Sequence, residues 1–197
     1  IGVIDSERAT SELYADRFDF DVLDLGNNLT VNDYLSAMDE AATAAINPLI
    51  VDSGTHAWQE LLVEVDRLTN TKYKGNSFQA WSEGTPKQKK LVRAIQSYPG
   101  HLIWTMRSKT EWLIEKDERT GRNRPVRVGL SPDQGKGIEY EFSLLLELTP
   151  EHICTVLKDR TGKFQDKVFE MPDESFGIEL IDWLNSGAVT DIPHPSV

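Results

Sequence analysis

Three short apolar segments of the chain each end in polar side chains of the kinds that handle phosphates and metal ions. These side chains belong to Asp5 and Glu7, to Asp52 and Ser53, and to Thr105 and Arg107. If the three segments are neighbouring parallel strands, their carboxyl ends meet at one edge of a sheet, where open α/β folds bind ligands. The layout therefore predicts a site for the phosphates of a nucleotide.

Each side chain suits a separate task at such a site. Asp52 could hold a magnesium ion beside Ser53, although a strand often ends in Asp because Asp caps the next helix. Glu7 could polarise an attacking water molecule. Thr105 or Arg107 could sense the terminal phosphate.

The elements that must position these residues are indicated by periodic apolar patterns. Strands are expected at 1–4, 21–25, 49–51 and 101–106, and helices at 9–16, 30–46, 57–68 and 86–98. Thr30 and Asp33 form a loose capping box at the start of the second helix. Alternating strands and helices predict an α/β fold, with a mostly parallel sheet flanked by helices.

The remaining segments predict two long loops and a C-terminal hairpin. Residues 70–84 and 113–137 are polar and contain glycine, so both are expected to be loops with a function. Strands at 140–148 and 153–157 predict an antiparallel hairpin added to the sheet, followed by a helix at 174–185. Residues 1–187 are expected to form one domain, with a frayed tail at 188–197.

Charge and cysteine content narrow the possible partners. A net charge of −11 argues against a broadly basic surface for nucleic acid. The single cysteine, Cys154, excludes an internal disulfide, which fits a reducing, cytoplasmic location. No apolar run approaches the length of a membrane span, so no membrane partner is expected.

The 113–137 loop is nevertheless locally basic. It could contact the phosphates of single-stranded DNA, with 70–84 as a weaker candidate. The alternative is that its arginines pair with the acidic residues at 115–118. The arginines are Arg119, Arg122, Arg124 and Arg127.

Several of these segments resemble a known family when taken in order. The segment Ile4-Asp5-Ser6-Glu7-Arg8-Ala9, with Leu13-Tyr14-Ala15 after it, resembles the part of RecA-type ATPases where a strand ends in a catalytic glutamate. Residues 49–53 resemble their Walker B strand, and residues 102–107 resemble the strand that ends in their phosphate-sensing residue. The resemblance is to the phage nucleotide-binding branch of the RecA-like and AAA ATPases and covers 1–164. It implies a RecA-like P-loop core that binds ATP and Mg²⁺.

A second resemblance concerns the end of the hairpin. Lys158-Asp159-Arg160-Thr161-Gly162 is similar to the Lys-x-Arg-x-Gly element of hexameric DnaB-like helicases. It implies that Lys158 and Arg160 reach the nucleotide of a neighbouring subunit, and hence a homo-oligomer in the form of a ring or filament. The alternative is a turn with two solvated charges. Lys136 could neutralise DNA phosphates together with the four arginines, or could instead reach a neighbour's nucleotide as loop-borne lysines of RecA filaments do.

One element of the family is absent from the sequence. The phosphate-binding loop Gly-x-x-x-x-Gly-Lys-Ser/Thr does not occur, and Gly135-Lys136-Gly137 is no substitute because no strand precedes it in the right frame. Because the sequence opens inside a strand, we expect this loop to lie upstream. The expected function is ATP hydrolysis in phage-type DNA recombination or single-strand annealing. The alternatives are a non-catalytic RecA-like assembly module and a motor that acts on protein.

Overall fold

The structure is a computed structural model that describes residues 1–116 and 123–187. The chain divides into two compact units, Ile1–Glu141 and Phe142–Val197, and each is described by itself. The expectation of one domain over 1–187 stays a prediction.

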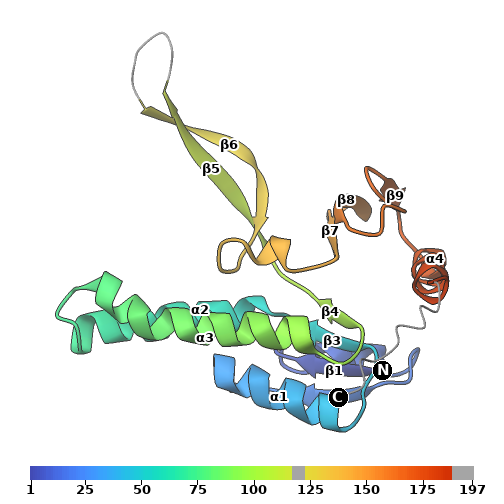
Figure 1. Cartoon of the computed structure of the whole chain (residues 1–197), viewed down its shortest axis with the longest axis horizontal. Helices are drawn as coiled ribbons and strands as arrows, with labels where there is room; N and C mark the ends of the chain where they lie inside the picture. Colours follow the sequence, from blue (N-terminus) through green and yellow to red (C-terminus); the bar gives the residue numbers. More distant parts are fainter. Residues whose placement is uncertain (117–122, 188–197) are drawn as a thin grey trace, which may run out of the picture. The chain divides into compact units, whose positions relative to one another are not determined.

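A four-stranded parallel sheet lies in the first unit (Figure 1). In the order β2-β1-β3-β4, it consists of β1 (Gly2–Asp5), β2 (Asp21–Asp24), β3 (Leu49–Asp52) and β4 (Leu102–Trp104). All four residues of β1 are buried, as expected for an inner strand of a parallel sheet. The four expected strands and the α/β class are thus confirmed.

The register of the sheet aligns the strand ends. Asp5 at the end of β1 lies opposite Asp24 of β2 and Asp52 of β3, and Val51 lies opposite Trp104 of β4. Because the strands end at the same level, the residues that follow them gather along one edge.

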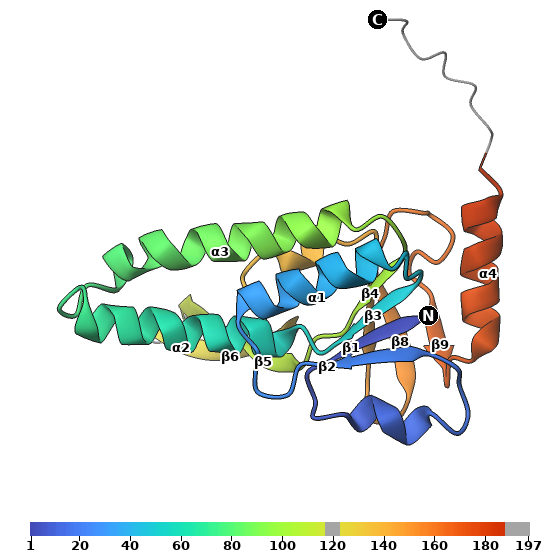
Figure 2. The same ribbon diagram turned by 90° about the horizontal axis from the view of Figure 1, so that it is seen from below.

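Three long helices pack against one another beside this sheet (Figures 1 and 2). They are α1 (Val31–Thr43), α2 (Thr55–Thr71) and α3 (Ser77–Ser97). The capping box of Thr30 and Asp33 is confirmed at the start of α1, whereas the helix expected at 9–16 is only a 3-10 turn, η1 (Thr10–Tyr14). Among the described helices, none is long and apolar enough to span a membrane.

The loop predicted at 70–84 is wrong. α2 continues to Thr71, and α3 begins after Asn76, whose side chain accepts a hydrogen bond of 3.1 Å from the amide of Gln79. Glycine is typical of loops, but a Cβ at Gly84 would lie 2.6 Å from Cγ2 of Val65 on α2. The glycine therefore allows two helices to approach closely.

The loop predicted at 113–137 is also wrong. Residues on either side of the undescribed segment form an antiparallel pair, β5 (Ser108–Lys116) and β6 (Asn123–Pro132), and a short turn, η2 (Ile138–Tyr140), follows. Glycines and arginines hid the strand pattern, although Val126 and the run Trp112-Leu113-Ile114 favour strands.

The second unit contains the C-terminal strands and the last helix. The hairpin of β7 (Leu144–Leu148) and β8 (Ile153–Asp159) is confirmed, but it pairs with β9 (Val168–Glu170) in a separate three-stranded sheet and is not part of the parallel sheet. α4 (Glu174–Asn185) has the predicted bounds. Phe164, Phe169 and Phe176 pack with ring centroids 4.9–6.2 Å apart. The predicted tail at 188–197 lies outside the described residues.

Candidate functional site

Glu7 and Arg107 meet at the carboxyl edge of the parallel sheet. Glu7 follows β1 and Arg107 follows β4, and Nη2 of Arg107 donates to both carboxylate oxygens of Glu7 at 2.7 and 2.8 Å. The guanidinium is half exposed, whereas the carboxylate is largely shielded from solvent. Two side chains that are 100 positions apart in the sequence are thus joined, as the alignment of strand ends predicted.

The backbone that carries Glu7 is held by a buried carboxylate. Asp5 accepts hydrogen bonds from the amide of Glu7 at 2.7 Å and from the amide of Ser11 at 2.8 Å. Burial alone would raise the pKa of Asp5, but hydrogen bonds from Ser11, Glu7 and Ala9 outweigh this effect and lower the pKa below its ordinary value. Asp5 therefore positions the loop and is not available to a ligand.

Asp52 and Thr105 form the second pair at this edge. The hydroxyl of Thr105 donates to Oδ1 of Asp52 at 2.6 Å, so two of the predicted residues are in direct contact. No described residue donates a hydrogen bond to Oδ2 of Asp52. A carboxylate with one oxygen held by a neighbouring hydroxyl and the other open is suited to bind a metal ion, because the hydrogen bond fixes its orientation.

A buried network holds the turn after β3. The carbonyl oxygen of Ser53 accepts hydrogen bonds from Tyr34 Oη at 2.7 Å and from Ser6 Oγ at 2.9 Å. Burial raises the pKa of Tyr34 to about 12, so its hydroxyl remains a donor at neutral pH. The hydroxyl of Ser53 accepts from the amide of Thr55 at 3.2 Å and so serves the start of α2. Binding of a cofactor by Ser53 stays a prediction.

His56, which the sequence alone does not assign to the site, lies beside it. Its Nδ1 is 2.9 Å from Oγ of Ser6, and its Nε2 is 3.7 Å from Oε1 of Glu7. Ser6 thereby orients the imidazole toward the carboxylate. The available signal was position: His56 comes four residues after Asp52, on the first turn of α2.

Gly54 and Gln134 are further residues that sequence reasoning did not connect with the site. A Cβ on Gly54 would lie 1.9 Å from Nε1 of Trp104, so only glycine fits beneath this indole. Gln134, which is buried, donates from Nε2 to the carbonyl of Gly54 at 2.8 Å. The segment after β6 is thus tied directly to the end of β3.

Other predicted residues do not join this group within the described structure. Lys136 is exposed and lines a hollow with Trp58 and Arg93, whose described lining includes neither Glu7 nor Asp52. Binding of a nucleotide by Lys136 therefore stays a prediction.

Lys158 and Arg160 belong to the second unit, at the end of β8. The carboxylate of Asp159, between them, accepts hydrogen bonds from the backbone amides of Thr161 at 2.7 Å and Phe164 at 2.6 Å, and so closes the turn. These hydrogen bonds give the turn a fixed base. The action of Lys158 and Arg160 on a neighbour's nucleotide stays a prediction.

Of the predicted DNA-contacting arginines, Arg119 and Arg122 lie outside the described residues. Arg124 and Arg127 lie on β6, where the backbone register sets Arg124 opposite Glu115 and Arg127 opposite Trp112. Contact with DNA stays a prediction for all four.

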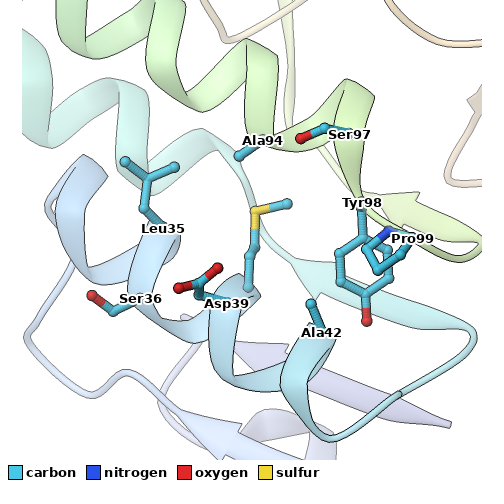
Figure 3. Close-up of a pocket in the computed structure, with 9 residues that line it drawn as sticks. Leu35, Ser36, Asp39, Ala42, Ala94, Ser97, Tyr98 and Pro99 are labelled. Carbon is cyan, nitrogen blue, oxygen red and sulfur yellow. The ribbon is translucent and has the colours of Figure 1, made fainter. Parts of the chain in front are cut away.

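A polar hollow between α1 and α3, with a volume of about 380 Å³, is not the site (Figure 3). Tyr98 lines it and donates to the carbonyl of Ile46, which precedes β3, so the hollow lies toward the amino ends of the strands. Asp39 is the one charged residue of its described lining. A phosphate would find no cation there.

The residues at the carboxyl edge fit a magnesium ion that is shared with phosphate. Within 1–116 and 123–187, no three His, Cys, Asp or Glu side chains form a group that could hold a metal ion. Mg²⁺ bound with nucleotide needs only one or two carboxylates, since phosphates and water supply the other oxygens. Asp52 meets this requirement.

Comparison with known proteins agrees with this geometry. A family model described as an AAA domain matches residues 2–168, which include β1 to β8 and the whole candidate site. Searches of curated proteins and of solved structures give no match. AAA domains are in general nucleotide-binding ATPases that use ATP with Mg²⁺. Since the match covers more than half of the chain, the chain belongs to the AAA domain family.

Proposed function

We propose that the chain is the core of a RecA-like ATPase of the phage nucleotide-binding branch, which hydrolyses ATP during DNA recombination or single-strand annealing. Membership of the AAA domain family supports the ATPase part. The observation that carries the proposal is the convergence of Glu7, Asp52 and Arg107 from three strands at one sheet edge.

Asp52 would hold the magnesium ion, and Thr105 would keep its carboxylate oriented. When bound, the ion neutralises charge on the phosphate oxygens. Asp52 is well placed for this task because it ends a buried strand directly beside the strand that leads to Glu7.

Glu7 would orient and deprotonate the attacking water, and Arg107 would respond to the terminal phosphate. Both oxygens of Glu7 accept from Arg107, so one must be released before the carboxylate can take a proton. A phosphate is a strong competitor for a guanidinium, because both form charge-assisted hydrogen bonds. Arrival of the terminal phosphate at Arg107 would thus free Glu7 to act as a base.

A neighbouring subunit and single-stranded DNA complete the proposal. Lys158 and Arg160 would reach a nucleotide in a homo-oligomeric ring or filament, where an arginine stabilises charge on the transferring phosphoryl group. Lys136 would contact a nucleotide, and the arginines of the β5–β6 segment would bind phosphates of single-stranded DNA.

A non-catalytic assembly module is the second candidate. It would be favoured if the full-length protein contained no Gly-x-x-x-x-Gly-Lys-Ser/Thr loop, which is the usual binding element for the phosphates. A motor acting on protein is the third candidate. It would hydrolyse ATP without any stimulation by single-stranded DNA.

The test is the variant Glu7→Gln, made in the full-length protein. We expect ATP turnover to fall at least about 100-fold, as for loss of a general base, while ATP binding is unchanged. Glu12→Gln, which removes the same charge from an exposed residue of η1, is the control and should turn over ATP normally.

Two results would contradict the proposal. Normal turnover by Glu7→Gln would remove Glu7 from the mechanism. Absence of turnover in the unmodified protein, with and without single-stranded DNA, would favour the non-catalytic module.

A further inference from the structure

We propose that a groove along α3, between this helix and the segment 135–141, binds single-stranded nucleic acid. The biological role of the groove rests on the proposed function. The residues that would bind nucleic acid there are different from the arginines of the β5–β6 segment. The groove consists of two adjoining hollows of about 520 and 710 Å³. They share four residues of α3: Trp81, Thr85, Lys89 and Arg93.

The groove is long enough for several nucleotides. Its described lining runs along α3 from Phe78 to Gln96, which is about 27 Å at 1.5 Å per residue. Stacked nucleotides follow one another at about 3.4 Å. A strand of several nucleotides can therefore lie along the helix.

The cations of the groove are available to phosphate. Lys89, Lys90 and Arg93 make no ion pair with a described residue, whereas the nearby Lys87 pairs with Glu64. The one carboxylate in the described lining is Glu141, to which Gln96 donates a hydrogen bond.

This positive charge is concentrated in a chain that is strongly acidic. The segment from Gly84 to Thr110 has six basic and no acidic residues, although the chain carries a net charge of −11. Three of the six, Lys89, Lys90 and Arg93, line the groove, whereas the other three form ion pairs with acids of other segments. Such segregation creates a local positive field to which a polyanion is drawn.

Aromatic rings in and beside the groove supply surfaces on which unpaired bases can stack, which positive charge alone does not provide. The rings of Trp58 and Trp81 stack with centroids 5.8 Å apart, Phe78 is 87% exposed and Tyr140 is 67% exposed. An exposed phenylalanine is unfavourable in water unless something covers it. Unpaired bases stack on such rings at about 1–3 kcal/mol each, but paired bases in a duplex do not offer their faces. The combination favours a single strand over a duplex.

The floor of the groove contains an unsatisfied polar atom and a direct link to the candidate active site. Oε1 of Gln88 is buried and has no hydrogen-bond partner among the described residues. Nε2 of Gln88 donates to Gln134 at 3.3 Å, and Gln134 donates to the carbonyl of Gly54 at the end of β3. A strand bound in the groove therefore contacts a chain of residues that leads to the nucleotide edge.

The test measures binding of fluorescent oligo-dT and oligo-rU of about 16 nucleotides by anisotropy. The variants are Lys89→Gln with Arg93→Gln, which removes two cations, and Phe78→Ala, which removes an exposed ring. The matched controls are Arg17→Gln with Arg67→Gln and the exposed Leu13→Ala. Arg67 lies about half a turn around α2 from Trp58, away from the groove.

We expect the double groove variant to bind at least tenfold more weakly, with the slope of log K against log salt smaller by about 1.4 for two lost phosphate contacts. Phe78→Ala should weaken binding at low and high salt alike, because stacking is not ionic. Both controls should bind as the unmodified protein does. Weakening on the DNA or on the RNA oligonucleotide supports the proposal and identifies the preferred sugar.

Three outcomes would overturn it: no binding by the unmodified protein, equal loss in the controls, or equal competition by polyglutamate of the same charge. ATP turnover without nucleic acid is measured on the same variants and should not change. If turnover is absent in every protein but the groove variants still lose oligonucleotide binding, the proposed ATPase function fails and the groove stands.

Discussion

At the scale of single residues, the carboxylates at the carboxyl edge have two roles: one stabilises the fold, and the others are placed to take part in chemistry. Asp5 is buried and accepts hydrogen bonds from two backbone amides, so its charge stabilises the fold. Glu7 and Asp52 each contact one side chain that a nucleotide or its metal ion could influence, Arg107 and Thr105. Residue type alone does not distinguish the two groups, because all three are acids that follow or end a strand.

Asp5→Asn should destabilise the protein by about 1–3 kcal/mol at neutral pH, because an amide cannot accept both amide hydrogens as a carboxylate does. The pKa of Asp5 in the folded protein is below its ordinary value of 3.8. Its stabilising effect is therefore present above that value and is lost as the pH falls through the lower folded pKa. Urea unfolding from pH 7 to pH 3 should show the variant and the unmodified protein converging at low pH. A constant difference across this range would contradict the role given to the charge.

Thr105→Val should weaken magnesium binding about 10–100-fold, because it removes the hydroxyl that orients Asp52. Thr105→Ser keeps the hydroxyl and is the matched control. The measurement is the magnesium concentration at half-maximal nucleotide binding, and nucleotide affinity without the metal should be equal in all three proteins. Equal magnesium affinity in Thr105→Val would show that the hydrogen bond from Thr105 does not help Asp52 to bind magnesium.

At the scale of elements, the site depends on parallel strands of matched register. β1, β3 and β4 end together, and the turns after them carry the reactive side chains. The packing of α2 on α3 supports this edge, since α2 begins at Thr55, whose hydroxyl accepts from the amide of Arg107 at 2.9 Å. Changes in the packing of α2 on α3 should therefore alter the position of Arg107 at the site.

Two glycines inside helices give opposite predictions. Gly84→Ala should destabilise the protein by about 1–3 kcal/mol, because the new Cβ would meet Val65 at 2.6 Å and Trp81 at 3.0 Å in the contact of α2 with α3. Gly177→Ala on α4 meets nothing within 4 Å and should stabilise by about 0.5–1 kcal/mol through helix propensity. Urea unfolding measures both. Stabilisation by both substitutions would show that propensity outweighs packing at Gly84.

At the scale of the whole molecule, charge is divided unevenly. A chain with a net charge of −11 leaves one long segment without an acid, and this segment includes most of α3 and ends beside Arg107. The acidic remainder keeps association with polyanions local, so a polyanion would be guided to the groove along α3.

The proposed trans action of Lys158 and Arg160 can be tested by mixing two inactive proteins. Glu7→Gln lacks the base and Arg160→Ala lacks the trans arginine, so each alone should turn over ATP very slowly. In a ring or filament with a heterologous interface, a 1:1 mixture should recover about a quarter of normal turnover at interfaces that combine both intact residues. The mixture of Glu7→Gln with itself is the control. No recovery, although mixed oligomers form by cross-linking, would place Arg160 outside the neighbour's site.

The sequence by itself determined the four parallel strands, the capping box at Thr30, the bounds of α4 and the gathering of Glu7, Asp52, Thr105 and Arg107 at one edge. These follow from local periodicity and from the rule that parallel strands share an edge.

Tertiary structure alone decided which partners the side chains have. The pairing of Glu7 with Arg107, the place of His56 and the link from Gln134 to Gly54 join residues 49 to 100 positions apart, which no local pattern encodes. It also decided that Gly84 lies within a helix, because glycine is favoured both in loops and at close contacts between helices. The groove along α3 has the same origin, since its rings and cations come together only when α2, α3 and the segment after β6 pack side by side.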